Sequence, residues 1–217
     1  SQIQHFDYAF IKFFKPVAYL PSDIDLLLKR DQLPAVSSIL HSLGYQQTVS
    51  EPNCVTFTGK VVIDVYINPD ALNIPYLCGR DLLKYVVVTE IGGVKIKKLQ
   101  NAAEVVLVAS HAVYKEQIVT LNDYYFVKRS LSRQSFQIAK KCSVYGALVY
   151  VLEVFRATER GKVNLPLKIP LTHTSKLFLS KIIEDPFSRR SVPWVCFKLF
   201  DRRVPQLMFC RIRRKTY

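Results

Sequence analysis

The segment "DIDLLL" at residues 23–28 places two acids, Asp23 and Asp25, at the start of an otherwise apolar run. Side chains alternate along a β-strand, so residues two apart point to the same face. Asp23 and Asp25 therefore lie side by side on one face of the predicted strand, where their negative charges repel each other. Solvent, a cation or a basic neighbour has to offset this repulsion.

A second apolar segment, "VVIDVYI" at residues 61–67, carries a single acid, Asp64. An Asp among apolar residues is costly to bury unless it is paired or coordinated. If this strand lies beside the first, then Asp23, Asp25 and Asp64 converge, and three carboxylates suit Mg²⁺ or Mn²⁺. Two alternatives stay open. The first pair could be solvated acids beside the basic residues that end the strand, and Asp64 could be the partner of a nearby Lys or Arg.

The order of periodic segments predicts an α/β (α+β) fold, in which one mixed sheet with helices precedes a mainly helical domain. Expected strands lie within residues 6–14, 23–29 and 54–68, and a hairpin turns at residues 92–93. Expected helices lie within residues 30–45, 81–87, 101–117, 120–132, 133–158 and 173–183. The first strands and helix form a β-α-β-β unit. We expect one domain at residues 1–95 and a second at residues 96–217.

Positive charge is concentrated at the end of the chain. The 217 residues carry a formal net charge of +14, and from residue 189 onward nine Lys and Arg face one acid, Asp201. Such a field attracts polyanions, so we expect a nucleic acid, RNA first, as a partner; a solvated basic surface is the alternative. The residues that we expect to contact nucleic acid are Arg202, Arg203, Arg211, Arg213, Arg214 and Lys215.

Cysteine usage and hydropathy favour a soluble, cytoplasmic protein. The five cysteines are scattered, and no CxxC pair occurs, which argues against a zinc module and a disulfide framework. We expect buried free thiols. No apolar run is long enough to span a bilayer, and the first residues lack the pattern of a signal peptide, so we expect no membrane contact.

"PSDIDLLLKRDQLPAVSSILHSLGY" resembles the signature of the polymerase-beta nucleotidyltransferase superfamily: a Ser turn, Asp-x-Asp on a strand, then a helix. "VVIDVYI" resembles the strand of its third carboxylate. "AFIKFFKPVAYLPSDIDLLL" and residues 98–131 are similar to a family of uncharacterised bacterial and archaeal nucleotidyltransferases that includes toxin-like members. The resemblance covers roughly residues 8 to 135 and implies a small catalytic sheet followed by helices.

The resemblance implies a metal-dependent transfer of a nucleoside monophosphate from an NTP to an acceptor, with a tRNA-like RNA expected from the charge. Asp23, Asp25 and Asp64 would bind Mg²⁺ or Mn²⁺, and Asp64 could act as the base. The remaining nucleotide-binding residues that it implies are Ser22, Lys12, Lys115 and Asp123. The sequence departs from the family pattern at Phe13 and Pro21, where glycines are usual.

Plainer interpretations accompany these assignments. Lys12 alternates with Ile11 and Phe13, so it could face solvent. Lys115 and Asp123 could be surface charges, and His111 a packing residue of its helix. The departures leave two further functions open: a non-catalytic nucleic-acid-binding protein on a degenerate scaffold, or the toxin of a toxin–antitoxin pair with an antitoxin as its partner.

Overall fold

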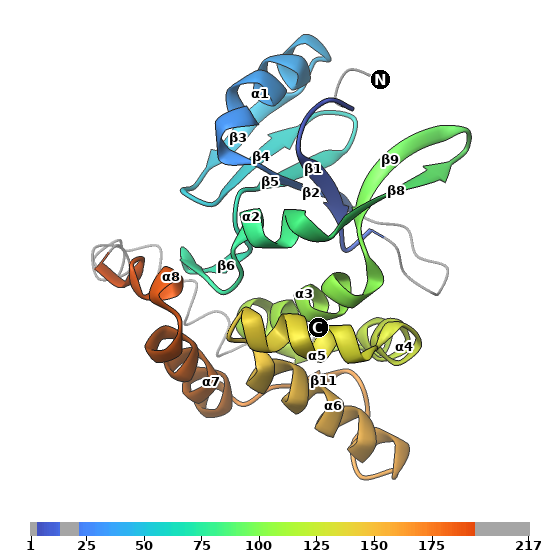
Figure 1. Ribbon diagram of the computed structural model, residues 1–217, viewed down its shortest axis with the longest axis vertical. Coiled ribbons are helices and arrows are strands. Elements are labelled where there is room, and N and C mark those ends of the chain that lie inside the picture. The colour runs from blue at the N-terminus through green and yellow to red at the C-terminus, as the bar shows by residue number, and fades with distance from the viewer. Residues whose placement is uncertain (1–3, 14–21, 194–217) are drawn as a thin grey trace.

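The computed structural model describes residues 4–13 and 22–193, which form a mixed sheet and a body of helices (Figure 1). The seven strands of the described sheet are β1 (Tyr8–Ile11), β2 (Asp23–Leu28), β3 (Gln46–Ser50), β4 (Cys54–Thr58), β5 (Val62–Tyr66), β8 (Val86–Ile91) and β9 (Val94–Leu99). Their order is β3-β4-β5-β2-β1-β9-β8. Two short strand pairs are β6 (Asp70–Ala71) with β7 (Ile74–Pro75), and β10 (Ile118–Val119) with β11 (Leu167–Lys168).

Helix α3 is the centre of the helical body. The helical segments are η1 (Arg30–Gln32), α1 (Leu33–Ser42), α2 (Gly79–Leu82), η2 (Leu83–Tyr85), α3 (Asn101–His111), η3 (Ala112–Glu116, a π-helical turn), α4 (Leu121–Ser130), α5 (Arg133–Lys141), α6 (Tyr145–Glu159), α7 (Leu171–Glu184) and α8 (Pro186–Arg189). Residues 102–110 of α3 are all buried, and the helix packs against α4, α5 and α6. A helix buried on all sides is apolar on all sides, which matches "AAEVVLVAS" except for Glu104 and Ser110. In the described part of the chain, every helix falls short of the length and apolarity that a bilayer crossing requires.

The alternation of β2 divides its side chains between two cores. Leu26 and Leu28 join Val36 of α1 in one apolar cluster, so α1 covers that face of the sheet. Leu27 points the other way and joins the cluster that contains α3. Because Asp25 alternates with Leu26, it shares the face of Leu27, which is the face turned toward the helical body.

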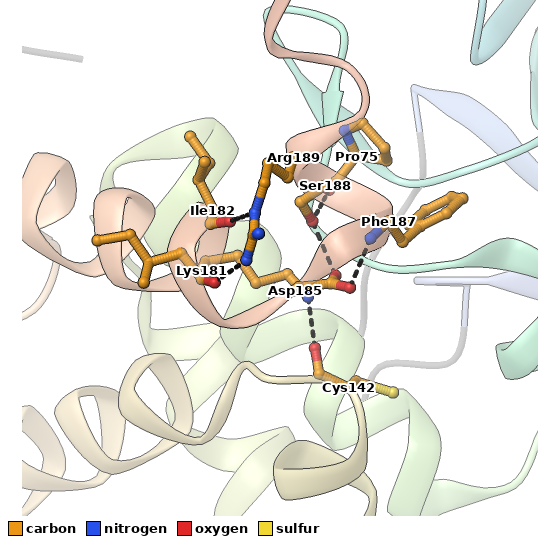
Figure 2. Close-up of polar contacts among 9 residues, drawn as sticks. Pro75, Cys142, Lys181, Ile182, Asp185, Phe187, Ser188 and Arg189 are labelled. Carbon is orange, nitrogen blue, oxygen red and sulfur yellow. Dashed lines mark hydrogen bonds and ion pairs between the residues drawn. The ribbon is translucent and has the colours of Figure 1, made fainter.

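A buried ion pair fastens the last two described helices to the rest of the molecule (Figure 2). Lys181 of α7 is 2% exposed, and its Nζ lies 2.5 Å from Asp185 Oδ2 and donates to the carbonyl oxygen of Cys142 at 2.5 Å. Ser188 of α8 donates to the carbonyl oxygen of Pro75 at 2.6 Å and to Asp185 Oδ2 at 2.9 Å. The network therefore joins α7 and α8 to the end of α5 and to β7.

The predicted fold class is confirmed: the chain has an α/β (α+β) fold with a seven-stranded mixed sheet in its described part. The structure adds one strand to the predicted β-α-β-β unit, β3, which follows α1. All its residues are exposed, so its sequence "QQTVS" carries no alternating apolar pattern that could have marked it. The sheet continues through β9, which contains position 95, and the division into two domains stays a prediction.

Candidate active site

Asp23, Asp25 and Asp64 come together on the face of the sheet that is turned toward the helices. The first two are alternate residues of β2, and β5 pairs with β2 in parallel so that Asp64 is the partner of Asp25. One carboxylate oxygen from each of the three lies within 4.8 Å of the other two. The convergence that the sequence suggested is present in the structure.

Asp25 has the most unusual environment of the three acids. It is 8% exposed, and its Oδ1 is buried without a hydrogen-bond partner among the described residues. Burial raises the pKa of its carboxyl group above the ordinary value; Lys12 opposes this shift, while the charges of Asp23 and Asp64 add to it. A buried acid oxygen without a donor is costly, so a positive ligand at Oδ1 would stabilise the site.

Each of the three carboxylates uses one oxygen within the protein. Asp25 Oδ2 lies 2.9 Å from Lys12 Nζ. Asp64 Oδ1 accepts a 2.6 Å hydrogen bond from Thr56 Oγ1, and Asp23 Oδ1 accepts a 3.2 Å hydrogen bond from Ser22 Oγ. Among the described residues, no hydrogen bond or ion pair is recorded to the second oxygen of any of these carboxylates, which could take a further ligand.

Lys12 lies in the site, so the interpretation that it faces solvent is wrong. Its backbone φ is +57°, in the left-handed region that is uncommon for residues other than glycine. Its N–H donates a short hydrogen bond to Oε1 of Glu104, which is buried on α3. This conformation ends the alternation of β1 and directs the Lys12 ammonium to Asp25.

Several solved structures are similar to this chain, and LnuA and ANT(2'')-Ia are two of them. The lincosamide antibiotic adenylyltransferase LnuA, in its lincomycin-bound crystal structure, is 16% identical with a TM-score of 0.40, and the match covers 58% of this chain and 85% of LnuA. The antibiotic-resistance factor ANT(2'')-Ia is 13% identical with a TM-score of 0.32, over 67% of this chain and 74% of its own. Both are members of the polymerase-beta-like nucleotidyltransferase superfamily.

No protein-family model matches the sequence, and no curated protein matches it significantly. At 16% and 13% sequence identity, these two structures do not establish the chemistry of the site, which depends on this chain's own side chains.

The three carboxylates fit a divalent cation. The buried Asp25 Oδ1 without a donor is the position where a positive ligand would remove the largest electrostatic cost. Carboxylate oxygens are the ligands that Mg²⁺ and Mn²⁺ prefer, and Mg²⁺ typically takes a few carboxylates together with water and substrate phosphates. Asp23, Asp25 and Asp64 are therefore the residues that would hold such an ion.

Lys115 is connected to the acids through a tyrosine. Its Nζ donates to Tyr66 Oη at 2.9 Å and lies 4.8 Å from the centre of the Tyr66 ring. Lys12 Nζ lies 5.1 Å from the same ring centre, and Tyr66 follows Asp64 by two residues on β5, so it points to the same face. Lys115 is thus part of the neighbourhood of the site, and nucleotide binding by Lys115 stays a prediction.

Asp123 lines a small cavity beside Lys12, but its carboxylate already has a structural task. Asp123 Oδ2 accepts hydrogen bonds from the backbone N–H and the hydroxyl of Thr120, at 2.9 and 2.7 Å, and closes the capping box of α4. The cavity measures about 110 Å³ and is also lined by His111 and Glu116. A nucleotide-binding role for Asp123 stays a prediction.

His111 packs as the plainer interpretation suggested. Burial is the main cause that lowers the pKa of its ring to about 3, so the ring is neutral. Its Nε2 therefore donates to Glu116 Oε1 at 3.3 Å rather than forming an ion pair, and its Nδ1 accepts from Tyr76 Oη at 3.1 Å. These bonds hold η3 against the loop that contains Tyr76.

Substitution of Asp64 by Asn is expected to stabilise the protein in the absence of metal. The change removes one of the charges that oppose ionisation of Asp25, and it keeps the oxygen that Thr56 contacts. We expect the free energy of unfolding, measured with urea in EDTA, to rise by about 1 kcal/mol, while Mn²⁺ binding is lost. Asp7→Asn, at an exposed acid, is the matched control. A loss of stability in Asp64→Asn beyond that of Asp7→Asn would contradict repulsion among the acids.

Sequence reasoning missed two residues of this neighbourhood, Glu104 and Tyr66. Glu104 is an acid in an otherwise apolar helix, which is the same signal that identified Asp64. Tyr66 is the next residue on the face of Asp64. The predicted nucleic-acid contacts from Arg202 to Lys215, together with Pro21, lie outside the described residues.

Proposed function

We propose that this chain is a divalent-metal-dependent nucleotidyltransferase, which moves a nucleoside monophosphate from an NTP to a hydroxyl of an acceptor. One observation carries the proposal: three carboxylate oxygens from two paired strands lie within 4.8 Å, and the most buried of the three acids has an oxygen without a donor. Carboxylates that accept an energetic cost in this way are typical of sites that bind a cation together with substrate phosphates.

The chemistry proposed for the site is a displacement at phosphorus. The acceptor oxygen forms a bond to the α-phosphorus, the bond from that phosphorus to the bridging oxygen breaks, and pyrophosphate leaves with that oxygen. Asp64 takes the proton of the acceptor hydroxyl as the general base. Ser22 donates its hydroxyl proton to the triphosphate in place of its hydrogen bond to Asp23 Oδ1. A bound divalent ion would neutralise the phosphate charges.

Charge supports a nucleic-acid acceptor. The net charge of +14 favours a polyanion over a small neutral acceptor. A tRNA-like RNA is the acceptor that we propose. Binding to such an acceptor should weaken steeply as salt is added, because each neutralised phosphate releases counterions.

The test is transfer of label from each α-³²P-labelled NTP to total RNA in the presence of Mg²⁺ or Mn²⁺, with EDTA as the negative control. We expect labelled RNA with at least one NTP and none in EDTA. Absence of transfer with all four NTPs and both metals to RNA would contradict the proposed acceptor, and free pyrophosphate release would then be measured with small hydroxyl compounds. Absence of both products would contradict an enzymatic function.

A second function is favoured by one observation: Lys12 already supplies a positive charge to Asp25 at 2.9 Å. If this ion pair is permanent and excludes metal, the scaffold binds nucleic acid without catalysis. That function predicts salt-sensitive RNA binding that Asp23→Ala leaves unchanged, together with the absence of metal-dependent transfer.

A further inference from the structure

We infer that Lys12 is a resident cation of the carboxylate site, so that the site takes one divalent ion instead of two. The inference rests on the proposed function only for the identity of that ion. It concerns the role of the Lys12 side chain, and the number of bound ions that it predicts can be counted without an activity assay.

The two oxygens of Asp25 have different environments. Oδ2 lies 2.9 Å from Lys12 Nζ, whereas Oδ1 is buried and has no hydrogen-bond partner in residues 4–13 and 22–193. A second divalent ion that bound Asp25 through its other oxygen would need Oδ2, which the Lys12 ammonium already contacts. The ammonium of Lys12 therefore stands where that second ion would contact Asp25.

The position of Lys12 is fixed by the fold and does not depend on a flexible side chain alone. Ile11 is paired with Asp25 across β1 and β2, so the backbone of Lys12 begins one residue beyond the acid. Its left-handed φ of +57° is held by the hydrogen bond from its N–H to buried Glu104. Its side chain is 16% exposed, and its Nζ lies 5.1 Å from the centre of the Tyr66 ring, which favours a cation at that place.

Unusual backbone conformations that the surrounding structure holds in place are concentrated at functional sites. A lysine that only had to face solvent at the end of β1 would need neither the left-handed conformation nor a buried acceptor for its N–H. The combination of both with an ion pair to Asp25 indicates that the ammonium is placed for the carboxylates.

The charges and the carboxylate oxygens of the site both indicate a single divalent ion. Three ionised carboxylates carry three negative charges, and the Lys12 ammonium cancels one of them, which leaves the charge of one divalent ion. Lys12, Thr56 and Ser22 each occupy one carboxylate oxygen. Each acid has a second oxygen, and one oxygen from each of the three acids lies within 4.8 Å of the other two, a spacing that suits a single ion.

The test counts bound Mn²⁺ by electron paramagnetic resonance of the free ion during titration of the protein without nucleotide. We expect one Mn²⁺ per chain in the wild type and two in Lys12→Met, which removes the ammonium and keeps the length of the side chain. Lys12→Arg keeps the charge, so we expect it to retain one. Lys97→Met is the matched control, because Lys97 Nζ contacts the Phe6 carbonyl oxygen and lies 5.4 Å from a tyrosine ring centre on the same sheet, and we expect one ion.

Each outcome decides the inference. Two ions in the wild type would overturn the inference and leave the proposed metal-dependent function intact. The same conclusion would follow if folded Lys12→Met bound one ion with the affinity of the wild type. No ion in the wild type or in any variant would overturn the proposed function and the inference together. Circular dichroism and thermal unfolding report whether Lys12→Met folds, and if it does not, the counts of the wild type and Lys12→Arg decide.

Discussion

Asp25→Asn is expected to lower the rate of nucleotidyl transfer by at least about 10³-fold, because it removes the charge of the most buried ligand of the proposed ion. Stabilisation of transition-state charge by a bound metal is worth several kcal/mol, and each 1.36 kcal/mol corresponds to a factor of ten in rate. Asn has nearly the same shape as Asp, so the packing around β2 is kept. The measurement is the initial rate of label transfer at saturating Mg²⁺ and NTP.

Asp7→Asn is the control for this experiment. Asp7 is exposed, and its contact with Lys29 is a long 3.9 Å ion pair at the surface, so its rate should equal that of the wild type. Wild-type activity in Asp25→Asn would contradict the assignment of Asp25 as a ligand. Equal losses in both variants would indicate a general effect of acid removal and not a site.

The convergence of the three acids could be predicted because it depends on local rules. Alternation places Asp23 and Asp25 on one face, and the placement of a second strand beside β2 brings Asp64 to the same height. Both rules need only the residue pattern and the assumption that the two apolar strands are neighbours. The same reasoning gave the helical spacing of α1 and the hairpin of β8 and β9.

The resemblance placed Lys12 at the site, but the residue pattern alone could not, because its position depends on a break in that alternation. A strand that continued through residue 12 would direct Lys12 away from Ile11, and this is the basis of the incorrect solvent-facing interpretation. The left-handed φ of Lys12 reverses its direction, and the cause is Glu104, which lies 92 residues further along the chain. A contact at that sequence separation leaves no trace in the local pattern.

The helical body shows a similar limit at Asp123. The resemblance implied a nucleotide-binding role for Asp123 and the plainer interpretation a surface charge, and the structure gives it a capping bond to Thr120. "TLND" satisfies the pattern of an N-cap Thr followed three residues later by an acid. The signal was therefore present in the sequence, and it indicated a structural task that the resemblance alone did not include.

Lys181→Met is expected to destabilise the protein by about 3 to 5 kcal/mol, the cost of leaving one partner of a buried ion pair without the other. Lys181 is 2% exposed, and its ammonium serves both Asp185 and the carbonyl oxygen of Cys142 (Figure 2). Both acceptors lose the ammonium as a donor in the variant, although Asp185 keeps its hydrogen bonds from Ser188 and from the backbone N–H of Phe187. The measurement is the free energy of unfolding from urea titration at pH 7.

Lys176→Met makes the same substitution at an exposed position of α7 and should change stability by less than about 0.5 kcal/mol. A change in Lys181→Met no larger than that of Lys176→Met would contradict the importance of the pair. The comparison separates loss of the buried contact from any effect of methionine on the helix itself.

The pH dependence of the free energy of unfolding, compared between the wild type and Lys181→Met, gives an independent measure of the ion pair between Lys181 and Asp185. Burial raises the pKa of Asp185, but the hydrogen bond and charge of Lys181, with the donors Ser188 and Phe187, outweigh it and hold the pKa below its ordinary value. A carboxyl group whose pKa is lower in the folded state stabilises the fold above its unfolded pKa, and this contribution is lost as the pH falls through the folded pKa. Unfolding measured from about pH 5 downward should therefore show a steeper loss of stability in the wild type than in Lys181→Met. Because Lys181 supplies the largest of the influences that lower the pKa, parallel curves for the two proteins would mean that Ser188 and the backbone of α8 hold Asp185 without it.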